Sequence, residues 1–387
     1  MVHNIARRKL HPIYLSISLL YTLFLCRKIY VVSQSEFIMS IVEWLEIPLY
    51  LILVYSIIKR NKLTKKLLIG VVSSIVSFLL MVYYSGLAEF LKATLIILAF
   101  KNCELKRLAK SFTRISVSII LITFVLYVLG ISDAGVMRRG FLAYGFKGGN
   151  ALGQVCFFLT IQAIISGYTL RRDIKVALLI TNIVCFILSN GRACAILSII
   201  AILLINNRVV SLFTKKFFKV VTYILPILST IGTFTVTLLY PSSSFVQKMD
   251  RLFSARILLN YRNLILFGIK PFGQKIQVYT TDVLYYNDVT KTYSTFNTID
   301  NAYMMGFISM GFITMLVVYL FYYLLVKKIY KDEQYNLIGV IICLCIFGLV
   351  DTLMLSIYVS IPFFYLTSRK GCFSIRKKTQ SKYSRAI

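Results

Sequence analysis

Long apolar runs alternate with short charged connectors along nearly the whole chain. An α-helix of about 20 apolar residues crosses the hydrocarbon core of a bilayer, so the pattern predicts about twelve membrane spans. The predicted spans cover residues 12–32, 37–58, 67–84, 87–100, 115–131, 150–170, 176–188, 193–205, 220–240, 302–326, 337–350 and 352–367. The sequence therefore predicts an all-α polytopic integral membrane protein, with residues 1–387 forming one membrane domain.

Two polar stretches separate the predicted spans. The first covers residues 132–149, and the second is a Tyr-rich segment of residues 241–301. A loop as long as the second one is usually functional or disordered in a compact protein. We therefore predict that residues 241–301 carry the chemistry of the protein and include a short helix.

Composition and charge fit a membrane protein. The chain is 58% hydrophobic and its mean hydropathy is +0.78, which excludes an ordinary soluble domain. The net charge of +30 does not indicate a nucleic-acid partner. Its basic residues gather in connectors such as 59–66, where cytoplasmic loops of membrane proteins carry them.

The distribution of Lys and Arg also predicts sidedness. About 30 of the 44 Lys and Arg residues lie on one predicted side and about 11 on the other, and the richer side is expected to be cytoplasmic. Both termini and the basic tail 369–387 are then cytoplasmic, while 132–149 and 241–301 lie outside. The first span lacks a small-residue cleavage site, which predicts an uncleaved helix. The remaining outer charge indicates an anionic partner such as a phosphate or diphosphate head group.

The eight cysteines lie in spans, at span ends or in basic connectors, and none lies in the two outer loops. This distribution predicts neither a disulfide framework nor a cysteine metal site. The outer loops hold no cluster of metal ligands, so we expect no metal and no cofactor.

The glycine-rich end of the first outer loop is one candidate anion site. Gly145, Gly148 and Gly149 allow a tight turn with exposed backbone N–H groups at the start of a helix. Asn150 is placed to cap that helix, and a capped helix start is the alternative interpretation of the whole segment. Arg138 and Arg139 add positive charge beside it or anchor the loop on lipid head groups.

Arg192 lies in the turn between two short spans. An Arg near hydrocarbon is costly unless it faces a partner or a water-filled cavity. A functional role and snorkelling to the interface both remain open.

The start of the long loop, residues 242–267, has the pattern of a helix. At 100° per residue, one face carries Arg256, Asn260 and Asn263, and another carries Arg251 and Arg262. Such a helix fits the membrane interface with its Arg groups over lipid head groups. A solvated basic helix is the alternative.

Two short segments bound the rest of this loop. Lys270-Pro271-Phe272-Gly273 predicts a sharp end to the helix. Asp300 and Asn301 lie at the mouth of the next span, as a helix cap or as an acid/base group.

Over about residues 138–311 the chain resembles the Wzy-type O-antigen and capsule polysaccharide polymerases, within the wider O-antigen ligase and polymerase group. The matching segments are Gly145-Phe146 through Asn150-Ala151-Leu152-Gly153, Ser189-Asn190-Gly191-Arg192-Ala193, Phe253-Ser254-Ala255-Arg256, Pro271-Phe272-Gly273 and Asp300-Asn301-Ala302-Tyr303 through Met310-Gly311. In this order they are similar to the family's Phe…Asn-x-Leu-Gly start of a span, Ser-Arg-small turn, Leu-Ser-Gly-Arg segment, Pro-Leu-x-Gly stretch and Asp/His-Asn…Gly pattern. Their order around one long outer loop carries the resemblance.

The resemblance implies a glycosyltransferase of the bacterial cytoplasmic membrane that joins oligosaccharide repeat units carried on undecaprenyl diphosphate. Donor and acceptor are both lipid-linked, and a flippase and a chain-length regulator are candidate partner proteins. It implies catalytic roles for Arg256, Arg192 and Asp300, with Asp282 and Asp288 as other candidates for the base. The implied substrate-binding residues are Arg251, Arg262, Asn260, Asn263, Arg138, Arg139 and Asn150.

Two departures separate the chain from the ligase branch. The only histidines, His3 and His11, lie on the predicted cytoplasmic side, and Gly148-Gly149 replaces a His-Pro pair. A polymerase is therefore the favoured interpretation over an O-antigen ligase-like enzyme. A lipid-linked oligosaccharide flippase or other transporter is the second alternative, because Glu43, Glu46 and Glu89 in predicted spans suit a proton relay.

The charge asymmetry makes a testable prediction of topology. Reporter fusions at Asp282 and within residues 59–66 should report opposite sides of the membrane, with Asp282 outside. A cytoplasmic signal at Asp282 contradicts the predicted location of the long loop.

Overall fold

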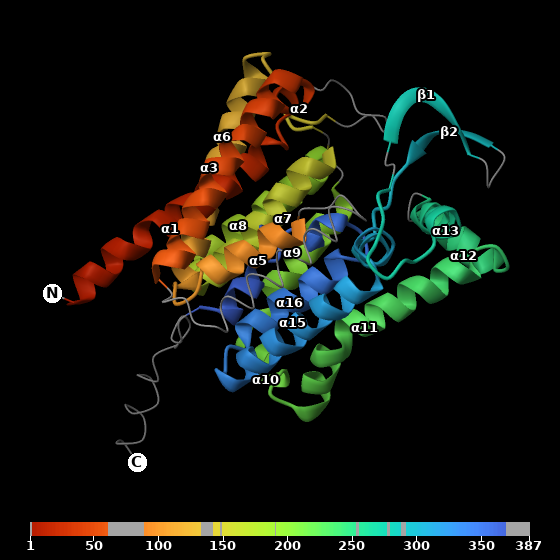
Figure 1. The fold of residues 1–387 in the computed structure, drawn as a ribbon. Helices are drawn as coiled ribbons and strands as arrows, with labels where there is room; N and C mark the ends of the chain where they lie inside the picture. Colours follow the sequence, from red (N-terminus) through yellow and green to blue (C-terminus); the bar gives the residue numbers. More distant parts are fainter. Residues whose placement is uncertain are drawn as a thin grey trace.

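The computed structural model describes residues 2–60, 89–132, 142–147, 149–189, 191–252, 255–276, 279–287 and 292–368. These residues form mostly helices that pack side by side, with one β-hairpin at the edge of the bundle (Figure 1). The helical class expected from the apolar runs is therefore confirmed in outline, and the hairpin is an addition to it. The predicted span 67–84 lies outside the described residues.

The first half of the chain forms most of the bundle. Its elements are α1 (Val2–Cys26), α2 (Tyr30–Gln34), α3 (Glu36–Arg60), α5 (Glu89–Ala99), α6 (Leu105–Val128), α7 (Gly149–Ser166), the 3-10 helix η1 (Tyr168–Leu170), α8 (Arg172–Ser189) and α9 (Arg192–Leu204). Helix α7 packs against α6, α8, α9 and α16 and is buried along most of its length. It is the central helix of the bundle.

The second half completes the bundle and carries the long loop. Its elements are α10 (Asn207–Leu212), α11 (Lys216–Leu239), α12 (Ser244–Leu252), α13 (Arg256–Phe267), β1 (Tyr279–Asn287), β2 (Thr292–Asn297), α14 (Ala302–Met305), the π-helix η2 (Gly306–Met310), α15 (Phe312–Lys331), α16 (Asn336–Phe347) and the 3-10 helices η3 (Thr352–Leu355) and η4 (Ile361–Leu366). Strands β1 and β2 pair antiparallel. Helices α12 and α13 and the hairpin lie on the same side of the bundle (Figure 1).

Among the described residues, four helices are long and apolar enough to cross a membrane: α3, α6, α11 and α15. Large apolar side chains cover their outer surfaces, as Phe37 (76% exposed) and Trp44 (72% exposed) do on α3. Such an apolar exterior suits lipid contact and not water. These helices are what a membrane protein requires, whereas the count of twelve spans stays a prediction.

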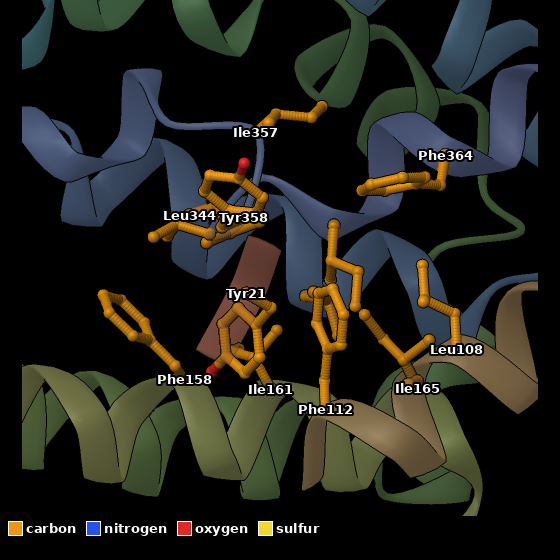
Figure 2. Packing of buried hydrophobic residues seen from close by; sticks show 14 of the residues in the cluster. Tyr21, Leu108, Phe112, Phe158, Ile161, Ile165, Leu344, Ile357, Tyr358 and Phe364 are labelled. Carbon is orange, nitrogen blue, oxygen red and sulfur yellow. The ribbon is translucent and has the colours of Figure 1, made fainter. Parts of the chain in front are cut away.

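Aromatic stacking organises the buried core between α1, α6 and α7 (Figure 2). The rings of Tyr21 and Phe112 stack with centroids 4.0 Å apart. The buried Tyr21 hydroxyl also has hydrogen-bond partners. It hydrogen-bonds the Ser116 hydroxyl at 2.8 Å and accepts a hydrogen bond from the Gln162 amide at 2.6 Å. Packing and hydrogen bonding thus fix α1 against α6 and α7.

The predicted span 302–326 is broken near its start. Helix α14 passes into the π-helix η2, and the chain turns at Gly311, where φ is +91°. The segment before Gly273 seals this break, because the N–H groups of Phe312 and Ile313 donate to Lys270 and Pro271 carbonyls at 3.2 and 3.0 Å. The long loop is therefore hydrogen-bonded into the broken helix.

Two more segments that the sequence predicts as single helices are interrupted in the structure. Residues 352–367 form the two short 3-10 helices instead of one span, and Pro362 near the start of η4 cannot supply an N–H to an α-helix. Residues 242–267 form α12 and α13 instead of one helix, since Ala255 adopts a left-handed conformation with φ of +64°. The kink re-aims α13 relative to α12.

Replacing Gly311 by Ala should destabilise the protein by about 2–5 kcal/mol. A Cβ at Gly311 would lie 2.6 Å from the Pro271 carbonyl oxygen and would be strained by the positive φ. Gly232→Ala is the matched control because a Cβ there meets no atom within 4 Å. A thiol-reactive dye that labels the buried cysteines as the protein opens measures both melting midpoints in detergent. Equal midpoints for the two variants would contradict the close docking at Gly311.

Candidate functional site

The segments expected outside gather at one end of the bundle, called the loop end here. It comprises, among the described residues, the 27–34 turn, 142–147 and 149–154, the start of α9, 250–252, 255–276 and 298–302, and 348–353. Backbone contacts join them: Tyr30 N–H donates to the Gly145 carbonyl at 2.9 Å, and Ala302 N–H donates to the Gly348 carbonyl at 2.8 Å. Chain segments far apart in the sequence are therefore joined there in pairs.

Arg256 is the first residue of α13, and the fold fixes its position. The Asp250 carboxylate accepts a hydrogen bond from Ile257 N–H at 2.7 Å, while the Asp250 carbonyl accepts from Ala255 N–H at 3.0 Å. A carboxylate at this place satisfies a free N–H of the helix start and complements its dipole. The buried Asp250 is thus a structural cap that orients Arg256.

The Arg256 guanidinium forms an ion pair with Asp300. Its Nε lies 3.1 Å from Asp300 Oδ2, and the two side chains are 29% and 38% exposed. The catalytic candidates Arg256 and Asp300, 44 residues apart in the chain, are therefore brought together. Both side chains are partly exposed, so the ion pair is not sealed inside the bundle.

The neighbouring Asn301 is the helix cap at the mouth of α14. Its Oδ1 accepts from Met304 N–H at 2.9 Å, and its Nδ2 donates to the Leu349 carbonyl at 3.0 Å and to Thr233 Oγ1 at 3.3 Å. Of the two adjacent residues, Asn301 therefore has the capping role, and Asp300 is left to pair with Arg256.

A second polar network runs beside this pair. Lys28 Nζ donates to Gln154 Oε1 at 3.1 Å, and Gln154 Nε2 donates to Asp351 Oδ2 at 2.5 Å. The other Asp351 oxygen accepts from Leu353 N–H at 2.9 Å. The network joins the turn after α1, the first turns of α7 and the segment after α16.

Electrostatics connect the two networks. Burial raises the pKa of Asp351, and the Asp300 carboxylate raises it further, while the Leu353 N–H, the Gln154 amide and the Lys28 ammonium oppose the rise. Burial lowers the pKa of Lys28, and Asp351 counteracts that change. The charges on Arg256, Asp351 and Lys28 all act on the Cys194 thiol. The ion pair and the buried network are therefore close enough to influence each other electrostatically.

Arg192 begins α9 next to this site and is exposed. Its neighbour Gly191 packs on Gly153, where a Cβ would lie 3.3 Å from the Gly191 Cα. The residue before Arg192 therefore contacts the residue before Gln154. The structure places Arg192 at the loop end.

The two predicted faces of α13 differ in burial. Asn260 and Asn263 are buried on the face of Arg256, and Asn263 Nδ2 donates to the Leu259 and Thr298 carbonyls at 2.8 and 3.3 Å. Their side-chain carbonyl oxygens find no hydrogen-bond partner among the described residues. Arg251 is exposed and Arg262 is half-buried. Both lie close enough to Tyr240 to oppose the rise that burial causes in its pKa.

Two backbone N–H groups of the glycine-rich segment already have partners, and Gly148 lies outside the described residues. The N–H groups of Phe146 and Lys147 donate to the Ala143 and Lys28 carbonyls at 3.0 and 2.8 Å, so they are not free to bind an anion. Asn150 is exposed and lies inside the first turn of α7, which begins at Gly149. The expectation that Asn150 is the N-cap is therefore wrong. Arg138, Arg139, Asp288 and the side chain of Asp282 lie outside the described residues.

Glu46, one of the carboxylates considered for a proton relay, forms two ion pairs. It pairs with Arg27 at 3.0 Å and with Lys92 at 3.4 Å, which ties the end of α1 to α3 and α5. Glu43 is exposed, and the Glu89 side chain lies outside the described residues.

The sequence analysis missed Lys28, Gln154 and Asp351 as site residues. A signal was present for two of them, because an ionisable residue inside or between apolar spans is a functional candidate by default. Within the described ranges, no group of three or more His, Cys, Asp or Glu side chains is placed to hold a metal ion. No protein-family model, curated protein or solved structure matches the chain significantly.

Proposed function

We propose that the protein is a polysaccharide polymerase that joins lipid-linked oligosaccharide repeat units. Donor and acceptor are carried on undecaprenyl diphosphate, and the reaction takes place on the outer face of the bacterial cytoplasmic membrane. The proposal takes its substrate class from the resemblance to Wzy-type polymerases. Its chemistry rests on the charged groups at the loop end.

One contact supports this proposal most directly, the ion pair between Arg256 and Asp300. A partly exposed guanidinium at the end of an apolar helical bundle is suited to a diphosphate held at the membrane surface. Arg stays charged and binds phosphate oxygens in a bidentate manner. At 4 Å and an effective dielectric constant of about 20, one such contact is worth roughly 4 kcal/mol.

The proposed reaction is a glycosyl transfer. A hydroxyl group of the acceptor attacks the anomeric carbon of the donor sugar, and the bond from that carbon to the diphosphate oxygen breaks. The diphosphate leaves with the bonding electrons, so negative charge develops beside Arg256. Asp300 holds the guanidinium in place, and Arg192, Arg251 and Arg262 supply further positive charge around the head group.

The arrangement of charge at the two ends supports the proposed sidedness. Connectors that the sequence assigns to the cytoplasm meet at the end opposite the loop end, where Lys219 lies 5.4 Å from the Tyr330 ring centroid. The Lys328 ammonium there donates to the carbonyls of Tyr365, Leu366 and Ser368. A site at the loop end would then face the outer leaflet.

Purified protein given only undecaprenyl-diphosphate-linked repeats in detergent should make a ladder of polymers without a nucleotide sugar. A deletion strain should hold single lipid-linked repeats on the outer leaflet, where an added lectin or glycosidase reaches them. These outcomes follow because the proposed reaction acts after the repeat has crossed the membrane. Protected repeats in the deletion strain and no ladder in vitro would instead identify a flippase or transporter.

Arg256→Ala should abolish the ladder while the amount of folded protein stays unchanged. Arg256→Lys should restore little of it, because a single ammonium group cannot reproduce a bidentate contact. Arg171→Ala is the matched control, since Arg171 forms an exposed pair with Asp173 at 2.6 Å far from the loop end. Full activity of Arg256→Ala removes this residue from the site, and full activity of Arg256→Lys reduces it to a general electrostatic role.

A further inference from the structure

We infer that Asp351 is the catalytic base that takes the proton of the attacking acceptor hydroxyl. This inference rests on the proposed glycosyl transfer and assigns the group that the sequence left open between Asp300, Asp282 and Asp288. Asp351 is held by the Gln154 amide and the Leu353 N–H, and its segment is hydrogen-bonded to the residues that follow Asp300. Lys28 supports Gln154 from the other side.

The other carboxylates described at the loop end already have roles. Asp300 holds the Arg256 guanidinium, which the reaction needs at the diphosphate. Asp250 is 4% exposed and caps α13. Neither can approach a sugar hydroxyl without giving up the contact that positions Arg256. Asp351 is half-buried, and its direct hydrogen-bond partners are neutral groups.

The backbone brings Asp351 close to Asp300. Ala302 N–H donates to the Gly348 carbonyl and Asn301 Nδ2 donates to the Leu349 carbonyl, at 2.8 and 3.0 Å. The two segments that carry Asp300 and Asp351 therefore run beside each other at the mouth of α14. This brings the Asp351 carboxylate near the Arg256–Asp300 pair, where the proposed diphosphate binds.

The surroundings of Asp351 suit a base. Burial and the nearby Asp300 carboxylate raise its pKa, which increases its affinity for a proton, and the Lys28 ammonium limits that rise. Cys194 on α9 faces the same network, and Lys147 acts on Lys28. A carboxylate that is more basic than usual is what general base catalysis requires.

The step balances without another reactant. The acceptor oxygen forms a bond to the anomeric carbon of the donor as its O–H bond breaks, and the proton moves to an Asp351 oxygen. The carbon–oxygen bond to the diphosphate breaks at the same time, and its electron pair leaves with the diphosphate. Asp351 then releases its proton to water and is ready for the next addition.

Asp351→Asn tests the assignment in the purified system. Asn can still accept the Leu353 N–H, so the local turn is preserved, but it cannot take a proton. The rate of ladder formation should fall by about 10²–10⁴-fold, while binding of the lipid-linked repeat changes by less than about threefold. Asp332→Asn is the matched control, because Asp332 accepts the Tyr365 hydroxyl at 2.9 Å at the opposite end of the bundle. It should keep the wild-type rate.

A pH profile separates a base from a merely structural carboxylate. The rate should fall as the pH drops through the pKa of Asp351, because only the ionised form accepts a proton. Lys28→Met removes a charge that lowers this pKa, so the acidic limb of the profile should move to higher pH. Lys28→Arg keeps the charge and should leave the limb near its wild-type position. This measurement applies even if Asp351→Asn fails to fold.

Three outcomes distinguish the inference from the function on which it rests. A wild-type protein that makes no ladder overturns the proposed function. A wild-type ladder together with an Asp351→Asn rate within tenfold of it overturns the role of Asp351 alone. Identical acidic limbs for Lys28→Met and Lys28→Arg overturn that role as well.

Discussion

Charged groups inside an apolar helical bundle are stable only when they have partners. An isolated buried charge costs several kcal/mol even after the protein relaxes around it. In this protein Lys28, Gln154 and Asp351 meet that requirement together, and they come from the start, the middle and the end of the chain. The same contacts that make these groups tolerable also bring the segments of the site together. The hydrogen bonds that give these buried polar groups their partners therefore also assemble the site.

A second constraint acts on the backbone near Gly311. A helix broken at membrane depth leaves N–H and carbonyl groups that need partners, and the 270–274 segment supplies them. Docking that segment fixes the end of α13, while Asn301 fixes the start of α14. Arg256 and Asp300 then approach each other from two anchored elements. Hydrogen bonds of neighbouring residues, in the 270–274 segment and at Asn301, therefore position the Arg256–Asp300 ion pair.

Hydropathy alone predicts the major helices well. The predicted span 37–58 corresponds to α3, and the span 220–240 corresponds to α11, because a long apolar run has few alternatives to a helix. The breaks at Ala255 and Gly311 depend on contacts between distant segments, and no local pattern contains them. The hairpin of β1 and β2 was missed because its residues fall in a polar loop.

The candidate site could be predicted only in part. Helical periodicity places Arg256, Asn260 and Asn263 on one face, which the structure confirms. The partnership of Arg256 with Asp300 could not be derived, because it requires knowing where two loops meet. Lys28 and Asp351 could be singled out as unusual, but Gln154 looks like any polar residue in an apolar helix. Its role is visible only when both of its neighbours are in place.

The long separation of Lys28 and Asp351 in the chain has a consequence for how the protein is made. Ribosomes add roughly 5–20 residues per second, so Asp351 is synthesised about 15–60 seconds after Lys28. Throughout that interval Lys28 lacks the carboxylate to which Gln154 links it in the folded protein. Asp351 lies in about the last tenth of the chain. Lys28 therefore gains its carboxylate partner only when synthesis is nearly complete.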